Sequence, residues 1–127
     1  MQETKSRGFI NIELLILIVI SSLLGITILS AYISARSQAR DKQRIADINA
    51  IQSALQIYFN ENGFYPSSVS GQPVGITDYL DRWPIPPKGD GCTSDSYAYA
   101  PKLNASDYAL TFCLVNGIHT LSSKQKP

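Results

Sequence analysis

An uncharged run of twenty residues, Leu14 to Ile33, constrains the fold of this chain more than any other feature. About 20 consecutive apolar residues is the length of helix that crosses the hydrocarbon core of a bilayer. An ordinary secretory signal peptide is the alternative, but its apolar core is shorter and its small-residue cleavage site follows that core. Here the small residue beside a basic stretch precedes the core, at Arg7-Gly8. The sequence therefore predicts an N-terminal membrane anchor.

Helical periodicity continues beyond the anchor. No proline occurs from Phe9 to Tyr65, and Asn62-Gly63 followed by Pro66 is typical of a helix end. We expect one helix from about Phe9 to Asn62, roughly 80 Å long at 1.5 Å per residue. The apolar stripe of its second half lacks a sustained heptad, which favours packing on the chain's own sheet over a coiled coil. The stripe consists of Ile45, Ile48, Ile51, Leu55, Tyr58 and Phe59.

The C-terminal half predicts a small sheet. Residues 66–95 are rich in Pro, Gly and Ser, which indicates loop. Strand patterns follow at 96–101, 107–115 and 117–121, and Asn116-Gly117 is typical of a type I′ hairpin turn. The expected fold class is α+β, with a long N-terminal helix packed on a small antiparallel sheet.

The two cysteines, Cys92 and Cys113, both lie in this half. An anchor upstream that places them outside the cytosol favours a disulfide over two unrelated thiols. Because Cys113 is out of phase with Phe112, the bond should lie on the sheet face opposite the helix. Charge counting favours the reverse orientation, because four basic residues follow the anchor and would be cytoplasmic by the positive-inside rule. They are Arg36, Arg40, Lys42 and Arg44.

Glu13 is a carboxylate at the entry of the apolar run, where an acid costs about 2.5 to 3.5 kcal/mol. No Lys or Arg lies within helical reach, since Arg7 is six positions away and Arg36 is at the far end. A cut after Gly8 would make Phe9 the N-terminus, and its ammonium could pair with Glu13 of a neighbouring chain. Such a pair would fix the axial register between helices.

The segment "RGFINIELL" resembles the type III signal of type IV pilins and type II secretion pseudopilins. That signal is a short basic leader ending in Gly, then Phe, a glutamate at the fifth mature position and a hydrophobic run. The stretch "ARDKQRIADINAIQSALQIYFNENGFYPSS" is similar to the helix and exit of the major-pseudopilin branch. The resemblance covers residues 6–68 and is architectural after that. Two features depart from the family pattern: Asn11 replaces an apolar residue, and the proline common within the anchor is absent.

The resemblance implies a maturation pathway and a set of partners. A membrane prepilin peptidase would cut between Gly8 and Phe9 and methylate the Phe9 amine, and Glu13 would register the incoming subunit. Platform and ATPase proteins would extract the anchors and stack them into a homo-oligomeric helical filament. The precursor would be a single-pass protein of the cytoplasmic membrane, and the product an extracytoplasmic or cell-surface filament. The expected segments are a cleaved leader (1–8), a transmembrane and filament-core helix (9–35), an amphipathic helix half (36–62) and a globular head (63–127).

Several other functions are disfavoured. No GxGxxG, GxxxxGKS/T, HExxH or GxSxG motif occurs, and the single histidine, His119, has no second ligand at metal spacing, so we expect no enzyme activity. A net charge of +1 does not favour nucleic acid as a partner. We expect no cofactor. Calcium is the alternative, because the resemblance implies the calcium site that major pseudopilins carry in their C-terminal loop. The candidate ligands are Asp90 and Asp95, whose spacing matches no defined calcium motif.

The interpretation that we favour from sequence is a type IV pilus subunit. The neutral head and the disulfide favour a pilin, while the helix similarity favours the alternative, a major pseudopilin of a type II secretion system. An alternative from another class is an uncleaved, membrane-anchored extracytoplasmic binding protein, in which Glu13 would be dispensable. A calcium-dependent extracellular binding module is a third.

Overall fold

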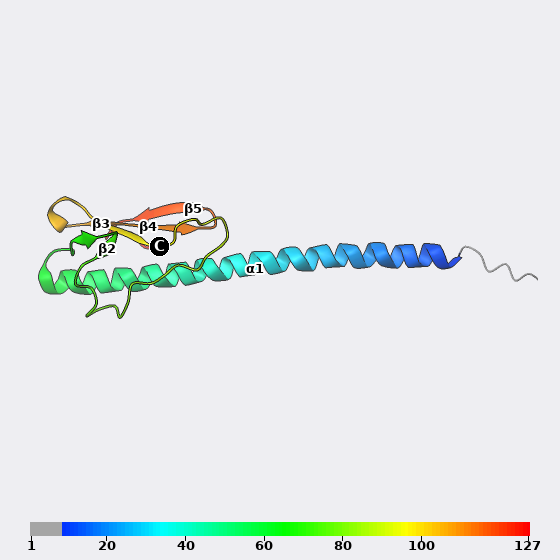
Figure 1. Cartoon of the computed structure of the whole chain (residues 1–127), viewed down its shortest axis with the longest axis horizontal. Helices are drawn as coiled ribbons and strands as arrows, with labels where there is room; N and C mark the ends of the chain where they lie inside the picture. The colour runs from blue at the N-terminus through cyan, green and yellow to red at the C-terminus, as the bar shows by residue number, and fades with distance from the viewer. Residues whose placement is uncertain (1–8) are drawn as a thin grey trace, which may run out of the picture. The chain divides into compact units, whose positions relative to one another are not determined.

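The structure, a computed structural model, describes residues 9–127, with side chains from residue 11 onward. Helix α1, Phe9–Asn62, is followed by five strands and one 3₁₀ turn (Figure 1). These are β1 Ser68–Val69, β2 Gln72–Pro73, β3 Ala98–Pro101, η1 Leu103–Ala105, β4 Tyr108–Leu114 and β5 Gly117–Leu121. The α+β prediction is confirmed. The chain divides into two compact units, of which the first ends at Arg36 and the second, the head, is Ser37–Pro127.

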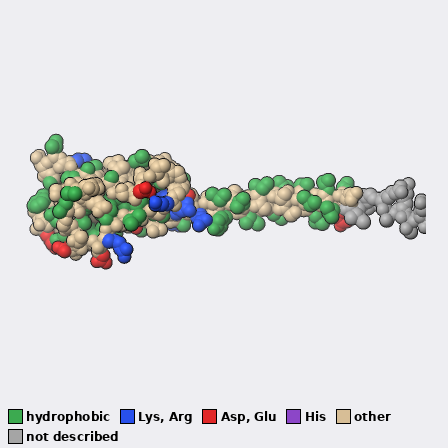
Figure 2. All heavy atoms as spheres, viewed as in Figure 1, with side chains coloured by type: hydrophobic (Ala, Val, Ile, Leu, Met, Phe, Trp, Pro, Cys, Tyr) green, Lys and Arg blue, Asp and Glu red, His purple; other side chains and the backbone are tan. Residues whose placement is uncertain are grey.

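The anchor part of α1 is covered in apolar side chains. All side chains from residue 11 to residue 35 are exposed in the single chain, and Figure 2 shows hydrophobic groups along this part of the helix. By length and composition, α1 is the one helix among the described residues that could cross a membrane. Four of its hydroxyl groups, those of Ser21, Ser22, Thr27 and Ser30, donate to backbone oxygens of the preceding turn. Ser21 Oγ donates to Leu17 O at 2.6 Å, and Thr27 Oγ1 donates to Leu24 O at 2.8 Å. Hydroxyl groups bonded in this way need no water, as a lipid environment requires.

The head contains a three-stranded antiparallel sheet in the order β3-β4-β5. Tyr99 pairs with Leu110 across β3 and β4, and Phe112 pairs with His119 across β4 and β5. The strands at 96–101, 107–115 and 117–121 were thus predicted to within two residues at each end. Figure 1 shows β3, β4 and β5 side by side along the head half of α1.

Two local predictions were wrong. The segment predicted as loop holds the short antiparallel pair β1 and β2, joined through Ser70 and Gly71, both at positive φ. The hairpin between β4 and β5 pairs Leu114 with Gly117, so its two-residue loop is Val115-Asn116 rather than Asn116-Gly117. Neither loop residue has the positive φ of a type I′ turn. A contact from α1 fixes the start of this turn, because the Val115 amide donates to the carboxylate of Asp41 at 3.2 and 3.3 Å.

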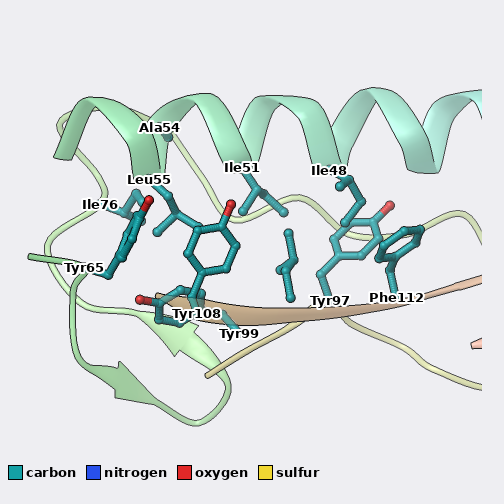
Figure 3. Packing of buried hydrophobic residues seen from close by; sticks show 11 residues of the cluster. Ile48, Ile51, Ala54, Leu55, Tyr65, Ile76, Tyr97, Tyr99, Tyr108 and Phe112 are labelled. Atoms are coloured by element: carbon teal, nitrogen blue, oxygen red, sulfur yellow. The ribbon is translucent and has the colours of Figure 1, made fainter. Parts of the chain in front are cut away.

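The core forms where the stripe of α1 meets the inner face of the sheet (Figure 3). Ile48, Ile51 and Leu55 project from α1 and are fully buried. The aromatic rings opposite these side chains come from β3, β4 and the segments before these strands. Neighbouring rings in the core pack edge-to-face or stacked. The other buried core members are Ala54, Tyr65, Ile76, Tyr97, Tyr99, Tyr108, Leu110 and Phe112. The head is therefore a two-layer α/sheet unit held by the helix stripe that the sequence predicted.

Candidate functional site

Glu13 is the one charged residue of the anchor part of α1 from residue 11 to residue 35. The helix begins at Phe9, so Glu13 lies one helical turn into it, about 6 Å along the axis at 1.5 Å per residue. Its side chain is exposed, and no ion pair between described residues involves it. The predicted leader, including Gly8 of the predicted cleavage site, lies outside the described residues. The described part of α1 thus presents one unpaired carboxylate on an apolar surface.

Cys92 and Cys113 form a disulfide, with their Cα atoms 5.7 Å apart. The strand residues out of phase with Cys113 point into the core: Tyr108, Leu110 and Phe112 are buried, and Leu114 is partly buried against the same cluster. Cys113 therefore lies on the other face of the sheet, and the bond ties the loop around Cys92 to that face. This is the position that the sequence predicted.

Two of the four basic residues after the anchor are part of the head's internal structure. Arg44 is fully buried; its Nη1 donates to Asp41 Oδ1 at 2.7 Å, and its Nη2 donates to Pro87 O at 2.7 Å. Arg40 Nη1 forms an ion pair with Asp90 Oδ1 at 2.5 Å. The positive-inside rule treats these two arginines as signals of membrane orientation, but their contacts show that they have a structural role in the head. Their contacts with the loop at residues 87–90 lie 43 to 50 positions away in the chain, which no local pattern reveals.

The candidate calcium ligands do not form a site together. Asp90 has a side chain that is 15% exposed and is paired with Arg40, whereas the Asp95 side chain is 80% exposed and lies 3.5 Å from Lys88 Nζ. Among the described side chains, no group of three or more His, Cys, Asp or Glu could hold a metal ion.

Two open grooves on the head lack acid–base chemistry. One, of about 480 Å³, lies between α1 and the C-terminal tail and is lined mainly by polar residues such as Gln52 and Gln125. The other, of about 410 Å³, is lined by aromatic residues such as Tyr58 and Phe64, with Lys102. Neither lining contains a His, Cys, Asp or Glu, so neither offers a nucleophile with an adjacent general base. These grooves give no support to an enzymatic role.

One partly buried carboxylate, that of Asp107, has a strongly shifted pKa. Asp107 accepts from Lys102 Nζ at 2.6 Å, from the Ser123 amide at 2.9 Å and from the Tyr108 amide at 2.8 Å. The hydrogen bond from Lys102, followed by the one from the Ser123 amide, holds the pKa of Asp107 well below its usual range. This cluster fastens the start of β4 to the loop before it and to the segment after β5, so its role is structural.

The chain is similar in sequence to several known proteins. No family model matches the chain, and no solved structure matches it significantly. The type II secretion system core protein G of Pseudomonas aeruginosa is 30% identical over 71% of this chain and 73% of its own length. The chain belongs to the pseudopilin family. Proteins of the same name from Klebsiella michiganensis and Escherichia coli K12 are 28% and 25% identical, over 76% and 88% of this pseudopilin and 66% and 73% of their own lengths.

Membership of this family confirms the predicted resemblance and the general pilin-like role. The names of the relatives favour the type II secretion alternative over the type IV pilus subunit that we favoured from sequence. The leader and the anchor chemistry are shared by both classes and could not separate them, whereas the similarity of the helix after the anchor had already favoured the pseudopilin alternative.

Proposed function

We propose that this pseudopilin is the major structural subunit of a type II secretion pseudopilus. The observation that carries the proposal is the lone carboxylate of Glu13, one turn into an apolar helix that begins at Phe9, in a chain related to core protein G. The chain is made as a membrane-anchored precursor and is cut between Gly8 and Phe9 by a prepilin peptidase, which methylates the new amine. The role of the subunit is structural.

Assembly follows from the energetics of that carboxylate. A charge surrounded by apolar groups costs several kcal/mol unless a cation pairs with it. Within this chain's described residues Glu13 has no such partner. The Phe9 ammonium of a neighbouring subunit supplies the cation, and the two helices are then in register. The assembly platform and its ATPase draw each anchor from the membrane into the growing filament, which lies outside the cytoplasmic membrane.

The test compares Glu13→Ala and Glu13→Gln with Asn11→Ala, a polar-to-apolar control on the same helical turn. Each variant is expressed with its secretion system, and processed protein is measured by mass in the membrane and sheared-filament fractions. We expect normal processing in all three. Because losing one partner of a buried ion pair costs about 3 to 5 kcal/mol, both Glu13 variants should lose filaments by about a hundredfold or more. Abundant filaments in Glu13→Ala would rule out the registration role of Glu13. Protein that keeps residues 1–8 and is absent from the filament fraction would instead favour the uncleaved, tethered binding protein.

A further inference from the structure

The loop that carries the candidate calcium ligands turns three oxygens toward α1. Arg44 Nη2 donates to Pro87 O at 2.7 Å and to Gly89 O at 3.3 Å. Arg40 Nη1 donates to the third oxygen, Asp90 Oδ1, at 2.5 Å. Two guanidinium groups therefore already engage the carbonyl and carboxylate oxygens of residues 87–90.

This arrangement does not fit calcium. A calcium ion takes six to eight oxygen ligands, and two fixed positive charges within hydrogen-bond distance of the same oxygens repel a dication. The remaining buried atoms of the cluster include a donor, Arg44 Nε, as well as the acceptor Asp90 Oδ2; neither has a hydrogen-bond partner among the described residues. Asp95 lies instead beside Lys88, on an exposed side chain. The oxygens around Asp90 that could coordinate a cation are therefore largely occupied by hydrogen bonds from the two arginines.

We infer that the arginines at positions 40 and 44 hold this loop in the place of a bound cation, so that the head folds and assembles without calcium. Arg44 is completely buried. Burial of a guanidinium costs free energy of desolvation unless hydrogen bonds and a counter-charge compensate for it. The bonds of Arg44 to the loop are therefore part of what makes its burial possible. The arginines and the loop lie in the same compact unit of the chain.

The backbone of the loop is shaped to admit Arg40. Gly89 has a φ of +112°, and a Cβ atom at this position would lie 2.8 Å from Arg40 Nη1. Asp90 and Gly91 follow with φ values of 61° and 77°, the left-handed pair that an Asp-Gly turn favours. The turn is closed by the Cys92 amide, which donates to Gly89 O at 3.3 Å, and Cys92 is fixed to β4 by its disulfide. Backbone conformation, disulfide and arginines thus hold the same short segment.

The first test is thermal unfolding of the full-length protein in detergent, with millimolar calcium or with the chelator EGTA. We expect the same Tm in both. A calcium site at a hundredfold excess of ion over its Kd would raise the Tm by about 10 °C or more, and such a calcium-specific rise would overturn the inference. This readout does not depend on filament formation, so its failure would leave the proposed function intact.

The second test removes the arginine. Arg40→Gln should lower the Tm in both buffers, whereas Lys42→Gln, an exposed cation on the same helix that makes no ion pair among the described residues, should leave it unchanged. Equal Tm values for Arg40→Gln and the unmodified protein would contradict the role of Arg40. In cells, filament abundance should be insensitive to chelator. A loss that calcium restores and magnesium does not would also overturn the inference.

Discussion

Tyr97 Oη donates a 2.7 Å hydrogen bond to Asp47 Oδ2, and this bond joins the residue before β3 to the head half of α1, fifty positions earlier in the chain. Tyr97 is 1% exposed. Burial, together with the bond to Asp47, raises the pKa of Tyr97 well above its ordinary value. The phenol therefore stays protonated and remains a donor throughout the pH range in which tyrosine would otherwise ionise.

Removal of the Tyr97 hydroxyl should lower the free energy of unfolding more than removal of a comparable hydroxyl whose acceptor is neutral. Tyr97→Phe leaves the Asp47 carboxylate without its donor, and we expect a loss of about 1.5 to 3 kcal/mol. Tyr99→Phe is the matched control, because Tyr99 Oη donates to Pro66 O at the same 2.7 Å distance. That variant should lose about 0.5 to 1.5 kcal/mol. Urea unfolding of both variants measures the difference; equal losses would show that the charge on Asp47 contributes nothing.

Arg44→Met should destabilise the head severely. The change leaves Asp41 without its cation and two loop carbonyls without a donor, and breaking a buried ion pair costs about 3 to 5 kcal/mol. Lys42→Met removes an exposed charge two positions away and should stay within about 0.5 kcal/mol of the unmodified protein. Chemical denaturation of the two variants gives both values. A small loss for Arg44→Met would mean that the burial of Arg44 is not needed to hold the loop.

The disulfide should contribute about 3 kcal/mol, as expected for a closed loop of about twenty residues. The double variant Cys92→Ser/Cys113→Ser and the reduced unmodified protein should therefore unfold at the same, lower denaturant concentration. Guanidinium titration with and without reductant makes the comparison. If reduction alone left the midpoint unchanged, the chain-entropy account of this bond would be wrong.

Asp107 should make stability depend on pH in the acid range. Its folded-state pKa lies below the unfolded value of about 4, so its contribution is complete above about pH 4 and is lost as the pH falls through the lower folded value. Asp107→Asn should be less stable than the unmodified protein near neutral pH, and this difference should shrink below about pH 4. Asp78→Asn, at an exposed position, is the control and should stay within about 0.5 kcal/mol of the unmodified protein near neutral pH. A difference that is the same at all pH values would assign the effect to packing rather than to the charge of Asp107.

Sequence periodicity was sufficient to predict the large elements. The uninterrupted pattern from Phe9 to Asn62 matched the bounds of α1, and the alternation around Phe112 predicted both β4 and the face that carries Cys113. Such patterns arise because burial on one face repeats with the period of the element. They carry no information about strands of two residues, so β1 and β2 were missed.

The arginine contacts show why the rest of the head was less predictable. Arg40 and Arg44 read as surface charges beside a membrane anchor, and only the folded chain brings Pro87, Gly89 and Asp90 to them. The Asp41 contact likewise sets the β4–β5 turn from a distant part of the chain. Where tertiary contacts decide a local conformation, turn propensity alone gave the wrong turn.

The most direct test of the account is the intact mass and N-terminal sequence of the protein recovered from membrane and sheared-filament fractions. The account predicts that the chain in filaments begins at Phe9 with a methylated amine, which supplies the cation that Glu13 needs. A chain that begins at Met1 in cells with an active prepilin peptidase would contradict it, because Glu13 would then have no N-terminal ammonium within reach in a neighbouring helix.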